Sequence, residues 1–141
     1  MKKILSFAAI AMFGFAAFTS CTKKSTSPGY TMGATINGHS YSSNAVSGKN
    51  GTILSVWGYT SATAISYPNI SIVLANYAAA GTYSLDGIFT AVTIDSSSTS
   101  AVTSSYGTVV ITSTSPLKGT FSATMTDSTK ITNGSFTAQA Q

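Results

Sequence analysis

The sequence contains no arginine and no glutamate, and it has only one cysteine, one histidine and three aspartates in 141 residues. A single cysteine cannot form a disulfide within the chain. One histidine and three aspartates are few groups for general acid–base catalysis. One histidine and at most one cysteine also cannot supply the ligands of the usual zinc sites. These absences predict a protein that is not an enzyme, with no catalytic residues, no metal and no other cofactor.

The few titratable side chains that could perform catalysis lie in positions that favour a structural role. His39 follows a predicted hairpin turn, and the aspartates lie in predicted turns or loops, at Asp86, Asp95 and Asp127. Aspartate in a turn usually accepts hydrogen bonds from its own backbone. No serine lies in a Gly-x-Ser-x-Gly elbow. A hydrolase with His39 in a Ser-His-Asp site is therefore a remote alternative.

Charged residues make up 7% of the chain, and they are not clustered. After removal of the first twenty residues, five lysines remain against three aspartates, a net charge near +2. No basic stripe is present, so nucleic acid is not an expected partner. Serine and threonine make up about a third of residues 21–141. Threonine favours strands, and hydroxyl groups are expected to replace charges on the solvated side of a sheet.

The first twenty residues have the pattern of a secretory signal peptide. Lys2 and Lys3 precede an apolar run over 4–18, and small residues lead to Cys21. The run is shorter than the roughly 20 residues of a spanning helix. A cysteine at the cleavage point resembles the lipobox of bacterial lipoproteins, which implies that the Cys21 sulfur carries a diacylglyceryl group.

The predicted organisation is a signal peptide, as a helix, over 1–20, a lipidated cysteine and flexible tether over 21–29, and a β domain over 30–141. The tether has no large apolar residue and reaches roughly 25 Å when extended. Its lipid makes a membrane the expected partner. Thr22 in place of aspartate favours the outer membrane, and the basic pair Lys23-Lys24 leaves open whether the domain faces the periplasm or the cell surface.

From residue 30 onward, apolar side chains recur with the period of two that is typical of half-buried strands. Asn37-Gly38 is a strong hairpin signal and predicts that Ile36 pairs with His39 and Ala34 with Tyr41. Further strand-like runs begin after turn residues, at 52–59, 70–74, 82–85, 88–94, 106–112, 117–126 and 130–138. Pro68 limits the start of one of them to an edge or a strand end.

This pattern predicts an all-β domain of about eight or nine short antiparallel strands. We expect a β-sandwich, with a flattened small β-barrel as the alternative. In the last strand, Ile131 and Phe136 are an odd number of residues apart, so both face the core only if the strand contains a β-bulge. Asn133-Gly134 lies between them, and glycine is the residue expected to adopt the positive φ of such a bulge.

Several segments resemble a family of small uncharacterised lipoproteins from Bacteroidetes. They are Met32–Gly38, Gly81–Tyr83, Gly107–Thr112, Lys118–Ser122 and Ile131–Phe136, and together they span about 32–138. The family has Trp or Phe where Tyr41 stands. The resemblance implies a secreted β domain of unknown function, and it brings no catalytic residues.

Two further sets of residues are candidate sites. Trp57 and Tyr59, with Tyr77, are aromatic side chains that can stack on sugar rings, although buried packing is the commoner role of such residues. Asp127-Ser128-Thr129 resembles the acceptor triplet for O-glycosylation in secreted Bacteroidetes proteins, in which Ser128 would carry the glycan; a plain turn is slightly favoured.

We therefore expect a non-enzymatic envelope lipoprotein whose β domain binds or adheres to a glycan or to an envelope protein. The alternative is a structural lipoprotein without a small ligand. An exposed Trp57 beside another aromatic residue would favour the first reading, and a uniformly hydroxylated surface would favour the second.

Overall fold

The computed structural model describes residues 29–59, 68–97 and 99–139, in which all regular secondary structure is β-strand. The predicted signal peptide, Cys21 and nearly all of the tether lie outside these ranges. In the described part of the chain, no helix is long and apolar enough to cross a membrane. The strands are β1 Thr31–Ile36, β2 His39–Asn50, β3 Ile53–Tyr59, β4 Asn69–Leu74, β5 Gly81–Leu85, β6 Thr90–Ser97, β7 Ser100–Thr114, β8 Leu117–Met125 and β9 Lys130–Ala138.

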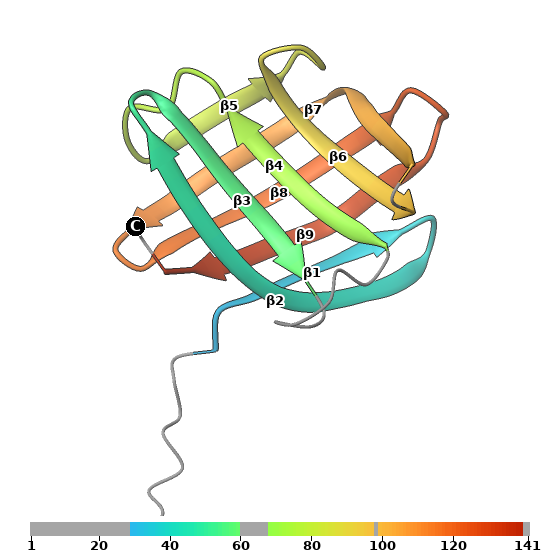
Figure 1. Cartoon of the computed structure of the whole chain (residues 1–141), viewed down its shortest axis with the longest axis horizontal. Helices are drawn as coiled ribbons and strands as arrows, with labels where there is room; N and C mark the ends of the chain where they lie inside the picture. Colours follow the sequence, from blue (N-terminus) through green and yellow to red (C-terminus); the bar gives the residue numbers. More distant parts are fainter. Residues whose placement is uncertain (1–28, 60–67, 98, 140–141) are drawn as a thin grey trace, which may run out of the picture.

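The strands form a closed eight-stranded antiparallel β-barrel with β5 as an extra strand. Each barrel strand pairs with the next along the chain, except that β4 pairs with β6, and β1 closes the ring by pairing with β9. The expected sandwich is therefore wrong, and the alternative, a small β-barrel, is correct at the level of a closed barrel. A sandwich consists of two separate sheets, whereas here the β1–β2 and β6–β7 pairings join the two walls. Figure 1 shows β2, β3, β4 and β6 in front of β7, β8 and β9.

Strand β7 is long because it pairs with three other strands. Along one edge it pairs first with β6, through Thr103, and then with β5, from Gly107 to Ile111; along the other edge it pairs with β8. The register shifts between Ser104 and Tyr106, where the neighbour changes. The hydroxyl of fully buried Ser104 accepts a hydrogen bond from the Val92 amide at 3.0 Å. The backbone N–H of Val92, which lies next to this register shift, therefore has a hydrogen-bond partner.

The core fills the barrel interior and follows the alternation seen in the sequence. Strand β8 is the clearest case, because every second residue from Leu117 to Met125 is buried. The largest fully buried side chains lie on both walls: Met32, Ile70, Ile72, Leu74, Ile111, Met125 and Ile131. Burial of each such side chain stabilises the fold by about 1.5–3 kcal/mol. With no disulfide available, this packing holds the barrel together.

The first hairpin has the predicted register. Ile36 pairs with His39 and Ala34 with Tyr41, and the turn residues have positive φ values of 48° at Asn37 and 84° at Gly38. Both central residues of a type I′ turn need positive φ, which explains the Asn-Gly dipeptide. This turn brings Ile36, His39 and Tyr41 to one end of the barrel.

The β-bulge in β9 is present, and Ile131 and Phe136 are both buried. Asn133, with φ of 51°, takes the positive φ rather than Gly134. Glycine is needed at 134 for a different reason, because a Cβ there would lie 2.5 Å from the Phe121 carbonyl oxygen on β8. The bulge was therefore predicted correctly, and the role of its glycine was not.

Candidate functional site

Trp57 lies on the outer side of β3 and is 42% exposed. Its register partner on β2 is Val46, and the indole covers the neighbouring Gly48, where a Cβ would come within 3.4 Å of the ring. Tyr59, two residues further along β3, lies on the same side and is half-buried. Two aromatic side chains thus lie side by side along one strand and are open to solvent.

These two residues belong to a larger apolar surface, which we call the apolar outer face. It comprises outward-facing residues of β2, β3, β4 and β6: Val46, Ile53, Trp57, Tyr59, Val73 and Ala91. Register pairs connect it, since Trp57 is opposite Val46 and Val73 is opposite Ala91. Side chains paired in this way have Cβ atoms about 4.5–5.5 Å apart. Between β3 and β4, Ser71 is opposite Trp57 and Ser55 is opposite Val73, so hydroxyls lie among these apolar side chains.

Tyr77 does not join this surface. It is only 6% exposed and packs against Tyr83 at a ring-centroid distance of 5.9 Å, with the Lys49 amine 5.3 Å from its ring centre. Burial, and to a smaller extent the neighbouring Tyr83, raises the pKa of Tyr77. The structure thus brings Trp57 and Tyr59 together on the surface and places Tyr77 in the core.

The opposite wall has a different outer surface, which we call the hydroxyl face. Its outward residues on β7, β8 and β9 are mainly hydroxylated: Thr108, Thr112, Thr120, Ser122, Thr124, Thr132, Ser135 and Thr137. A shallow hollow of about 460 Å³ lies on it, next to Tyr106, which is well exposed. The barrel thus has one wall that carries Trp57, Tyr59 and further apolar side chains, and one wall that is mainly hydroxylated.

Ser128 lies in the exposed β8–β9 turn, with a φ of 70°. The Asp127 carboxylate accepts a hydrogen bond from the Thr129 amide at 2.9 Å, and the Ser128 amide donates one to the Met125 carbonyl at 3.0 Å. The triplet therefore forms a tight, hydrogen-bonded turn, and the Ser128 hydroxyl points to no partner among the described residues. Its position is compatible with either reading of the triplet, as a turn or as an acceptor.

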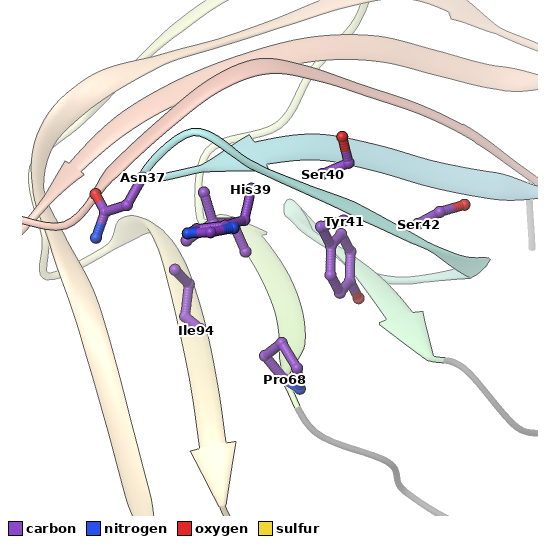
Figure 2. A pocket seen from close by; sticks show the side chains of 8 residues that line it. Asn37, His39, Ser40, Tyr41, Ser42, Pro68 and Ile94 are labelled. Atoms are coloured by element: carbon purple, nitrogen blue, oxygen red, sulfur yellow. The ribbon is translucent and has the colours of Figure 1, made fainter.

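A pocket of about 460 Å³ opens at the end of the barrel where the first hairpin lies. Its walls come from β1, β2, β6 and the start of β4, and the residues that line it are Ile36, Asn37, His39, Ser40, Tyr41, Ser42, Pro68 and Ile94. Figure 2 shows His39 and Tyr41 directed toward Ile94 and Pro68, whereas Ser40 points to the other side of β2. We call this space the mouth pocket.

Sequence reasoning did not identify the mouth pocket as a site. The hairpin register already placed Ile36, His39 and Tyr41 on one side, which was a usable signal. Ile94 and Pro68 are far away in the sequence, and only barrel closure brings them opposite that hairpin. No carboxylate lines the pocket, so the geometry around His39 does not include the aspartate of a hydrolytic triad. In the described ranges, no three His, Cys, Asp or Glu side chains gather as a metal site would require.

Comparisons with known proteins do not add a family to this description. No protein-family model matches the chain, and no curated protein and no solved structure gives a significant match.

Proposed function

We propose that this chain is a non-enzymatic lipoprotein of the cell envelope whose β-barrel is a binding or adhesive module. The observation that supports binding is the exposure of Trp57 beside Tyr59 on the apolar outer face. Tryptophan and tyrosine combine a large apolar area with a polar edge, and they are enriched at binding surfaces. The indole contacts β2 at Gly48, where no side chain covers the ring.

The ligand of this surface is a glycan or an envelope protein. A sugar ring would stack on the indole, and a protein would cover more of the apolar outer face. The structural alternative, a lipoprotein without a small ligand, is supported by the hydroxyl face on the other wall, which is the uniformly wet surface that such a protein would present.

The anchor in this proposal is the lipid on Cys21, in the outer membrane. A single acyl chain binds a membrane only marginally, and two chains give stable anchoring. Mass spectrometry of the protein from native membranes should find a mature chain that begins at residue 21 with a diacylglyceryl cysteine. A free thiol at Cys21, or a chain that begins elsewhere, would contradict the anchor without affecting the barrel.

Glycan-array binding tests the recognition surface. The purified protein is compared with Trp57→Ala and with a matched control, Phe89→Ala, which also removes an exposed aromatic side chain but lies on the β5–β6 turn. Trp57→Ala removes the aromatic ring on which a sugar would stack, so it should weaken glycan binding about tenfold or more, as expected for a central aromatic contact. Phe89→Ala should bind like the wild type. If neither the wild type nor a variant binds any glycan, the glycan form of the proposal is wrong.

A further inference from the structure

The mouth pocket lies between β2 on one side and β4 and β6 on the other. Strand β2 pairs with β3 from Asn44 onward, and in the described ranges its residues from His39 to Ser43 pair with β1 alone. Strand β4 begins at Asn69, next to Pro68, and Ile94 is opposite Ile70 in register. Figure 2 shows His39 and Tyr41 of β2 across from Ile94 and Pro68.

The chemistry of the lining favours an uncharged and mostly apolar occupant. Ile36, Ile94 and Pro68 provide aliphatic surface, and the Tyr41 ring adds an aromatic one. The polar groups of the lining are His39, Asn37 and two serines, and it includes neither Lys nor Asp. A volume of about 460 Å³ lies within the range of small-molecule sites, about 300–1,000 Å³, and the mouths of β-barrels are a common place for such sites.

Tyr41 contributes its ring to the pocket and not its hydroxyl. The ring lines the pocket, and the side chain is 8% exposed. The hydroxyl is buried deeper, beside Gly58, where a Cβ would come within 2.7 Å of it. A molecule in the pocket therefore contacts the aromatic ring.

We infer that the mouth pocket binds a small, uncharged, largely apolar molecule. The molecule lies against Ile36, Ile94 and Pro68. His39 lies at the rim, where it borders the entrance. This site is separate from the apolar outer face and does not depend on the function proposed for Trp57.

Fluorescence of N-phenyl-1-naphthylamine, an uncharged apolar probe, tests the pocket in detergent-free buffer. The wild type should enhance the probe signal with one site per chain. His39→Trp places a large ring at the entrance without changing a core residue, and it should weaken probe binding about tenfold. Phe89→Ala is the control and should bind like the wild type. Absence of saturable binding by the wild type would overturn the inference.

The probe also has apolar surface to bind outside the pocket, and two variants distinguish the sites. If Trp57→Ala abolishes the signal and His39→Trp leaves it unchanged, the probe lies on the apolar outer face and the inference is wrong. The proposal for Trp57 fails or succeeds separately, because it is tested with glycans. Circular dichroism spectra and unfolding curves show whether each variant is folded before its binding is interpreted.

Discussion

Gly134→Ala tests the physical account of the β9 bulge, because alanine adds a single methyl group there. In the register, Gly134 is directly opposite Phe121. A Cβ at 134 would lie 2.5 Å from the Phe121 carbonyl oxygen and 2.7 Å from two atoms of its ring. The ring cannot withdraw easily, since it is 4% exposed and packs on Phe136 at a centroid distance of 6.3 Å. The carbonyl cannot withdraw without disturbing the β8–β9 pairing.

Forcing an extra methyl group into a packed core typically costs about 1–3 kcal/mol. We expect Gly134→Ala to be in the upper part of that range, about 2–3 kcal/mol, because one of the clashing atoms belongs to the backbone. With a urea m value of about 2 kcal/mol/M, the midpoint of unfolding should fall by about 1–1.5 M. Far-UV circular dichroism gives that midpoint.

Gly81→Ala is the matched control. A Cβ at Gly81, the first residue of β5, would have no heavy atom within 4 Å. Glycine within a strand is less favourable than alanine by about 0.5–1 kcal/mol, so this substitution should raise the midpoint slightly. The two glycine substitutions should therefore act in opposite directions. If Gly134→Ala costs no more than Gly81→Ala, the close approach of β8 and β9 at the bulge is not what requires glycine at 134.

Two further predictions concern the β5–β6 turn and the core. The Asp86 carboxylate accepts a hydrogen bond from the Thr90 amide at 2.8 Å, and this bond, followed by the one from Ile88, lowers the pKa of Asp86. A carboxyl whose pKa is lowered by folding stabilises the protein above its unfolded pKa of about 3.9, and this contribution is lost as the pH falls through the lower folded value. Asp86→Ala should therefore be less stable than the wild type at neutral pH, and the two urea midpoints should converge as the pH falls below about 4; a constant gap would contradict the assignment. In the core, Ile72→Ala should lower the free energy of unfolding by about 2–5 kcal/mol because Ile72 is fully buried. Ile53→Ala, at an exposed position, should change it by about 0.5 kcal/mol or less. Similar losses of stability for the two variants in urea unfolding would contradict the burial of Ile72.

The two outer faces suggest how the barrel is used. Serine and threonine make up most of the outer side of the wall formed by β7, β8 and β9. Apolar side chains are more frequent on the opposite wall, around Trp57. Neighbouring exposed apolar residues mark an interaction site more often than singly scattered ones do. This difference between the walls is why the proposed binding surface is placed at Trp57.

Much of the fold could be predicted because it depends on local chemistry. Alternation along 117–126 predicted β8, and Asn37-Gly38 predicted the register of the first hairpin, since both depend on the period of a strand or the φ values of a turn. The β-bulge was predicted because Ile131 and Phe136 are an odd number of residues apart and can both face the core only if the strand contains a bulge. The positive φ of Asn133 could not be read from the sequence, because asparagine and glycine both adopt that conformation.

The sequence of β3 did not predict which of its residues face the core. The run over 53–59 has apolar residues at both parities, Leu54 and Val56 on one side and Ile53 and Trp57 on the other. The packing of the barrel decided which side of β3 faces the core. A Cβ at residue 58 would lie 2.5 Å from the Ser43 hydroxyl, so the inside of the barrel has room only for glycine at that position. Its neighbour Trp57 therefore faces outward.

The sequence alone determined the approximate positions of most strands, the first hairpin and the absence of a disulfide within the chain, because these depend on neighbouring residues and on composition. Only the tertiary structure decided that the sheet closes, because alternating strands suit a sandwich and a barrel equally and the β1–β9 pairing joins residues about a hundred positions apart. In the closed barrel, Tyr77 is buried in the core and Trp57 lies on the surface. It also placed Ile94 and Pro68 opposite Tyr41, and the mouth pocket exists for that reason.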